Sequence, residues 1–173
     1  MPTRPIILAA VDLDRHAPAV IEQAARLAAL SQAHLVVTHV VDDAPGYGSD
    51  QPFPQRPGDL RAAMARHARA WLVGMINHLD LPNHSVEIRV ETGSPIPTLA
   101  DLVVELHPRY CLLGPARLGP LSPSAGLAAA IGGRSHCALL SATTRAGTDG
   151  DGLLRRVQRW LPERRTMTSQ GTR

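Results

Sequence analysis

The sequence predicts a single α/β domain built on an open parallel sheet with helices on both faces. Three observations support this fold class. Short apolar runs alternate along the chain with stretches of helical periodicity. The apolar runs are continuous, which is typical of strands covered on both faces. A length of 173 residues and a hydrophobic content of 44% are enough for one sizeable core.

The first half of the chain is expected to contain two strands and two helices. Ile6–Asp12 is an apolar run that ends in an acid, and Asp14 stands where it would cap a helix over 17–30. His34–Val41 is a β-branched run that is too short for a typical buried helix. A stretch with few helix breakers, 59–79, places Leu, Met and Trp at helical spacings, so one of its faces should pack on the sheet.

The second half continues the alternation and brings the expected total to five strands and four helices. Because parallel strands need right-handed crossovers, a ligand is expected beyond the carboxyl ends of the strands, where the strand order reverses. The expected strands are Ser85–Val90, Tyr110–Leu113 and Cys137–Leu140, and the expected helices are Pro95–His107 and Leu127–Ile131.

Two segments fall outside this alternation. Residues 42–58 are rich in Pro and Gly and predict a long loop, which is either a solvated connection or a lid. The domain is expected to span 1–144, followed by a tail over 145–173 with seven arginines against three acidic residues. The tail contains an amphipathic basic helix over 153–161 that would pack on its own dimer, dock on a partner protein or lie on an anionic membrane surface. Its two turns are short for membrane attachment, which favours the first two readings.

Charge and composition exclude several classes of partner and location. The net charge is +3, of which the tail holds +4, so the body is nearly neutral at −1. That balance, with aromatic residues at only 3%, argues against a nucleic-acid groove. No segment approaches the roughly 20 apolar residues of a membrane-spanning helix. Residues 1–15 lack the order of a signal peptide, so we expect a cytoplasmic protein.

The chemistry-bearing residues indicate no enzymatic site. The chain has no lysine, which excludes a Schiff base, and its eight histidines lack metal-ligand spacing. His39 lies near the carboxyl end of the second expected strand, close to the expected ligand site, and is either a surface histidine or a pH sensor. Cys111 and Cys137 are expected to be reduced, buried and inert, with a redox switch as the alternative.

Four motifs resemble the universal stress protein family in their order and spacing. They are IILAAVDLD near the start, HVVD at His39–Asp42, ETGSP at Glu91–Pro95 and CLLGPARLG at Cys111–Gly119. The resemblance covers about residues 5–142. It implies the Rossmann-like strand order 3-2-1-4-5, a homodimer formed through the last strand, and membership of either an ATP-binding or a non-binding branch.

The nucleotide motif of the binding branch is broken in this chain. Binders carry a glycine, two residues, a second glycine, nine residues, and a glycine followed by a small hydroxyl residue. Glycines let backbone N–H groups approach phosphates, and the next helix N-terminus adds its positive dipole end. Gly114 matches the first position, but Arg117 occupies the second, and Leu127 and Ala128 occupy the final pair.

Parts of a nucleotide site nevertheless survive in the resemblance. A shift by one residue would use Gly126, and Gly119 would supply a loop glycine, while Arg117 offers a forked guanidinium for a phosphate. Asp12 matches the family's acid after the first strand, and Val40 matches the backbone that meets adenine. The structural alternatives are a strand-ending acid for Asp12 and an ordinary core valine for Val40.

Two functions therefore compete. The first is a non-enzymatic stress-response or regulatory homodimer that acts through protein contacts, with lost or altered nucleotide binding and no certain cofactor. The second is a switch protein that binds ATP or another adenine nucleotide with Mg, with slow hydrolysis as its only enzymatic activity.

Overall fold

A computed structural model describes residues 4–42, 57–79, 81, 86–114 and 123–142. It contains one parallel sheet of five strands in the order β3-β2-β1-β4-β5. The predicted fold class and strand order are thus confirmed. In chain order the elements are β1 (Ile6–Ala10), α1 (Ala17–Ser31), β2 (His34–Val41), α2 (Pro57–His78), β3 (Val86–Thr92), α3 (Pro95–Leu106), β4 (Tyr110–Leu113), α4 (Pro123–Ile131) and β5 (Ala138–Ser141).

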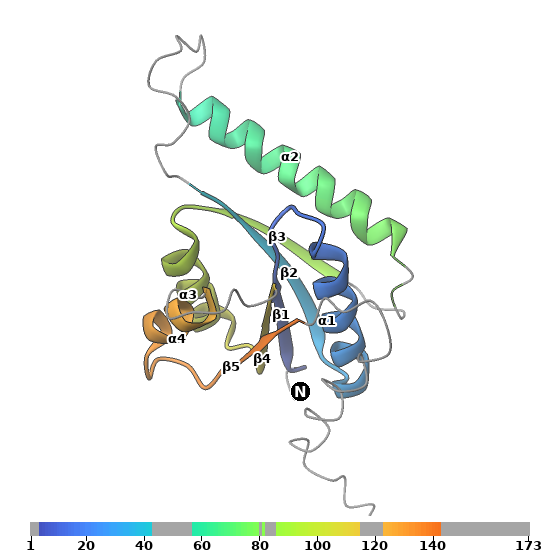
Figure 1. Cartoon of the computed structure of the whole chain (residues 1–173), viewed down its shortest axis with the longest axis vertical. Helices are drawn as coiled ribbons and strands as arrows, with labels where there is room; N and C mark the ends of the chain where they lie inside the picture. Colours follow the sequence, from blue (N-terminus) through green and yellow to red (C-terminus); the bar gives the residue numbers. More distant parts are fainter. Residues whose placement is uncertain (1–3, 43–56, 80, 82–85, 115–122, 143–173) are drawn as a thin grey trace, which may run out of the picture.

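Helices cover both faces of the sheet, as the continuous apolar runs predicted. Figure 1 shows α1 and α2 on one side and α3 and α4 on the other. We call these the first face and the second face. Because side chains alternate along a strand, neighbouring residues of each strand serve opposite faces.

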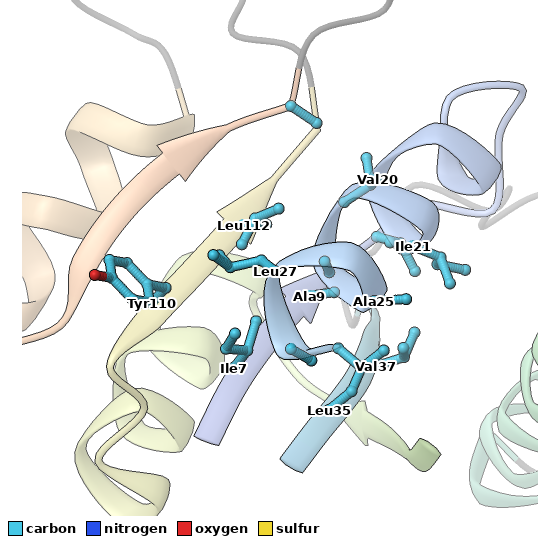
Figure 2. Packing of buried hydrophobic residues seen from close by; sticks show 14 of the residues in the cluster. Ile7, Ala9, Val20, Ile21, Ala25, Leu27, Leu35, Val37, Tyr110 and Leu112 are labelled. Atoms are coloured by element: carbon cyan, nitrogen blue, oxygen red, sulfur yellow. The ribbon is translucent and has the colours of Figure 1, made fainter. Parts of the chain in front are cut away.

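The first face holds a continuous apolar core beneath α1 and α2. Figure 2 shows side chains of α1 packed against those of β1, β2 and β4. Leu72 of α2 is also fully buried in this cluster. The strand residues at its centre are Ile7, Ala9, Leu35, Val37 and Leu112, and those of α1 are Val20, Ile21, Ala24, Ala25, Leu27 and Ala28.

The second face holds a smaller cluster beneath α3 and α4. Its strand residues are the immediate neighbours in sequence of those in the first-face core. A shift of one position in a strand would therefore move that strand's side chains from one core to the other. Buried members are Leu8, Ala10, Val36, Cys111 and Leu113 from the strands, and Ala100, Leu102, Val103, Leu127 and Ile131 from the helices.

One predicted helix cap is wrong. The N-cap residue of α1 is His16, and Asp14 lies two residues earlier. The Asp14 carboxylate accepts a hydrogen bond from the His16 N–H at 2.8 Å, so the acid closes a turn ahead of the helix instead of capping it. The C-terminus of α1 is closed by Gln32 in the left-handed conformation, with φ of 51°.

Two sequence predictions lie outside the described residues. These are the loop, of which 43–56 are outside, and the tail over 145–173 with its helix at 153–161. Among the helices that the structure does describe, none combines the length and the apolarity needed to cross a membrane.

Candidate functional site

The candidate site lies at the carboxyl end of the sheet, between β1 and β4. After β1 the chain turns to α1 on the first face, whereas the segment after β4 leads to α4 on the second face. The two connections therefore leave the sheet on opposite sides. In open α/β sheets such a reversal point is where ligands bind.

Strand register brings three predicted site residues to this place. Ala10 pairs with Thr38, so Asp12 and Val40 each lie two residues beyond a paired position of neighbouring strands. Gly114 directly follows β4, on the other side of β1. Asp12 is exposed, Gly114 is half-buried, and Val40 is 9% exposed. Arg117 and Gly119 lie outside the described residues.

The main chain of Val40 faces the β1 side of β2, at a level where β1 has already ended. The His34 N–H donates to the Pro5 carbonyl at 2.8 Å, and the Thr38 carbonyl accepts from the Val11 N–H at 2.9 Å. Main-chain polar groups alternate between the two neighbouring strands, so those of Val40 point the same way as those of His34 and Thr38. By that point β1 has ended.

Gly126, the third predicted site glycine, contacts a side chain of a neighbouring helix. It lies in α4, and a Cβ atom added there would lie 2.7 Å from Ile96 Cδ1 of α3. The glycine leaves room for the tip of the Ile96 side chain where α3 and α4 are in contact. The unshifted spacing of the family motif places its final glycine at position 127, which is occupied by Leu127. This leucine is only 1% exposed and belongs to the second-face core.

Gly93 is the glycine of the ETGSP motif and lies at the same end of the sheet, directly after β3. Its φ is +141°, and an added Cβ would lie 2.7 Å from Thr98 Oγ1. Its N–H donates to the Val41 carbonyl at 3.0 Å, which joins β2 to the start of α3. Glycine is needed here for conformation and for space.

The two thiols lack the lowered pKa of a reactive cysteine, and the histidines that the structure describes belong to no metal-binding group. Burial raises the pKa of the Cys111 thiol far above its ordinary value and raises that of Cys137 to about 11. Both thiols are therefore protonated at neutral pH. Cys111 is buried as predicted, whereas Cys137 is only partly buried. Within the described residues no three His, Cys, Asp or Glu side chains form a group suited to a metal ion.

Sequence reasoning missed an ionic cluster on the second face of β2 and β3. His34 Nε2 lies 3.1 Å from Glu87 Oε2, and Arg89 donates to Glu87 and to Glu105, each at 2.8 Å. The Arg89 guanidinium and then the His34 ring lower the pKa of Glu87. The only sequence signal is charge at alternate positions of β3, which indicates a partly solvated face.

Comparisons with known proteins agree on one family. The model of the universal stress protein family matches residues 3–140. No protein of curated function matches the chain.

Three solved structures illustrate the structural likeness. A member of the universal stress protein family from Burkholderia pseudomallei is 22% identical, with a TM-score of 0.55 over 82% of this chain and 97% of that one. A universal stress protein from Archaeoglobus fulgidus in complex with dAMP is 20% identical, with a TM-score of 0.52 over 83% and 100%. A third, in complex with cAMP, is 17% identical, with a TM-score of 0.50 over 83% and 99%. These likenesses establish the shared fold.

Proposed function

The chain belongs to the universal stress protein family, and from this premise we propose that it is a non-enzymatic stress-response module with altered binding of adenine nucleotides. The base side of the site is retained and the phosphate side has changed. The observation that carries the proposal is the contrast between Val40 and Leu127. Val40 turns its main-chain polar groups to the β1 side of β2 after β1 has ended, whereas the motif's final glycine is replaced by a buried core leucine.

The changed phosphate side favours a ligand with one phosphate. Leu127 offers no polar side chain, and Ala128 lacks the hydroxyl of the family motif. Arg117 replaces the second glycine and would bind a single phosphate through its guanidinium. Both dAMP and cAMP, found in complexes of similar structures, carry one phosphate. We therefore place adenine mononucleotides ahead of ATP.

An adenine-nucleotide switch that uses ATP with Mg is the second candidate. It is favoured by Asp12, which is exposed shortly after the end of β1 and would contact a ligand or its metal ion. In this version Gly119 would belong to the phosphate loop and Gly126 to the first turn of the helix α4 that follows it. The chain has no lysine to stabilise a transferring phosphate, so fast hydrolysis is not part of either proposal.

The proposed unit is a cytoplasmic homodimer formed through β5. Within the part of the chain that the structure describes, β5 pairs only with β4, so its other side offers main-chain groups that a second copy would pair with. The segment over 153–161 is proposed to contact a partner protein through its apolar side. In this scheme a bound nucleotide changes which contacts the dimer makes.

A thermal-shift titration with AMP, dAMP, cAMP and ATP, with and without Mg, tests the proposal. A ligand that binds only the native state stabilises it by about 2.7 kcal/mol at a concentration of 100 times Kd. We expect a saturable shift with the mononucleotides that Asp12→Ala abolishes. Asp101→Ala is the matched control, because Asp101 is an exposed acid on α3. A stronger, Mg-dependent shift with ATP would favour the switch, and no shift with any ligand would overturn nucleotide binding.

A further inference from the structure

The side chain of His39 bonds to the carbonyl oxygen at which the backbone pairing of β1 with β2 would otherwise continue. Its Nδ1 lies 2.9 Å from the Val11 carbonyl oxygen. The Val11 N–H donates to the Thr38 carbonyl, so the next bond of a regular parallel ladder would run from the Val40 N–H to the Val11 carbonyl. Among the described residues no backbone bond joins Val40 to Val11.

The chemistry of the two groups fixes the direction of this bond. A carbonyl oxygen only accepts, so His39 Nδ1 must carry the proton and donate it. This holds for the neutral tautomer with hydrogen on Nδ1 and for the imidazolium, so protonation of Nε2 leaves the bond in place. The contact therefore links the side chain of His39 in β2 to the main chain that follows β1.

The hydrogen bond from His39 to Val11 affects two residues of the candidate site, Asp12 and Val40. It holds the Val11 carbonyl, which directly precedes Asp12. It also engages the Val11 carbonyl at which a continued ladder would place the Val40 N–H, and among the described residues that N–H, which points to the β1 side of β2, makes no backbone bond to Val11.

We propose that His39 is a positioning residue that ends the β1–β2 pairing at Val11 and thereby keeps the main chain of Val40 for a purine base. A main-chain N–H and C=O that point the same way match adenine, whose N1 accepts and whose N6 amino group donates. Guanine presents the opposite order, because its N1–H donates and its O6 accepts. In the same position its N1–H would face the Val40 N–H, and its O6 would face the Val40 C=O. The inference rests on the proposed adenine-nucleotide site and adds the residue that sets its base selectivity.

The test compares the affinity for AMP with that for GMP in variants of His39. In the wild type we expect AMP to bind more tightly. His39→Leu removes the donor and frees the Val11 carbonyl for the Val40 N–H, so the preference for AMP should fall by about tenfold, the effect of one hydrogen bond. His39→Asn keeps a donor close to the position of Nδ1 and should restore the preference.

His34→Leu is the matched control, because His34 lies in the same strand and contacts Glu87 far from the site. It should leave the ratio of the two affinities unchanged, which separates selectivity from general destabilisation of β2. A His39→Leu protein that binds with unchanged selectivity would overturn the positioning role and leave the proposed function standing. A wild-type protein that binds neither nucleotide would overturn the proposed function and the inference together.

Discussion

The two faces of the sheet are built differently although the same strands supply both. The first face is an uninterrupted apolar cluster under α1 and α2. The second face has a smaller apolar cluster, a buried hydroxyl of Thr38 without a hydrogen-bond partner among the described residues, and the ionic cluster around Glu87. The first face therefore buries more apolar side chains than the second and is expected to contribute more hydrophobic stabilisation.

The candidate site belongs to the less regular part of the molecule. By strand alternation the side chain of Val40 lies on the same face as that of Val36, which is the second face. Gly126 lies in α4, next to Ile96 of α3 on that face. Local departures from apolar packing concentrate where proteins bind ligands, because a polar or open position is hard to combine with a dense core. The comparison therefore predicts that substitutions on the two faces have unequal effects.

The largest expected effect is the loss of a leucine from the first face. Leu35→Ala should lower the free energy of unfolding by about 3–5 kcal/mol, because it leaves a cavity in a strand that has neighbours on both sides. Leu127→Ala should cost less, about 2–3 kcal/mol, because alanine is a good helix former and the short helix α4 can relax into the cavity. Denaturant unfolding of both variants measures the difference, and an equal or larger loss for Leu127→Ala would contradict the comparison.

A stabilising substitution is expected on the second face. Thr38 is 0% exposed and its Oγ1 has no hydrogen-bond partner among the described residues. Thr38→Val keeps the shape and removes the unsatisfied hydroxyl, so it should raise the free energy of unfolding by about 1 kcal/mol. Thr92→Val, at an exposed position of β3, is the control and should change stability by less than about 0.5 kcal/mol. Destabilisation by Thr38→Val would mean that the hydroxyl has a partner in the native protein.

The elements were predictable from local pattern, whereas their side-chain contacts were not. Apolar runs located the strands closely, because a buried parallel strand needs continuous apolar residues. The strand order came from the family resemblance. The tie between His39 and Val11 and the pair of His34 and Glu87 join different strands, and the latter pair is 53 residues apart in sequence.

Errors and gaps in the site prediction have a similar cause. Asp14 has the residue type of an N-cap, but the path of the turn places His16 at that position. Gly126 fits a shifted phosphate motif, and only the crossing of α3 and α4 reveals its packing role. Asp12, Val40 and Gly114 were brought together as predicted, because strand ends in a parallel sheet follow from strand order alone.

The smallest expected effect is a pH dependence on the second face. The pKa of Glu87 lies below its ordinary value of 4.5, because Arg89 and His34 bind its carboxylate. A lowered folded-state pKa adds stability that is fully present above the unfolded-state value and is lost as the pH falls through the folded-state value. The Glu87 side chain is 42% exposed, so solvent screening limits this contribution to about 0.2–1 kcal/mol.

Glu87→Gln should therefore destabilise the protein slightly near neutral pH, and its difference from the wild type should shrink as the pH falls below the ordinary carboxyl range. Glu91→Gln is the control on the same strand, since Glu91 has no ion-pair partner among the described residues. Unfolding curves at about neutral pH and at about pH 3.5 measure both effects. A difference between Glu87→Gln and wild type that stays constant over this range would show that packing, not charge, holds Glu87 on the second face, and would make the two faces more alike than their composition indicates.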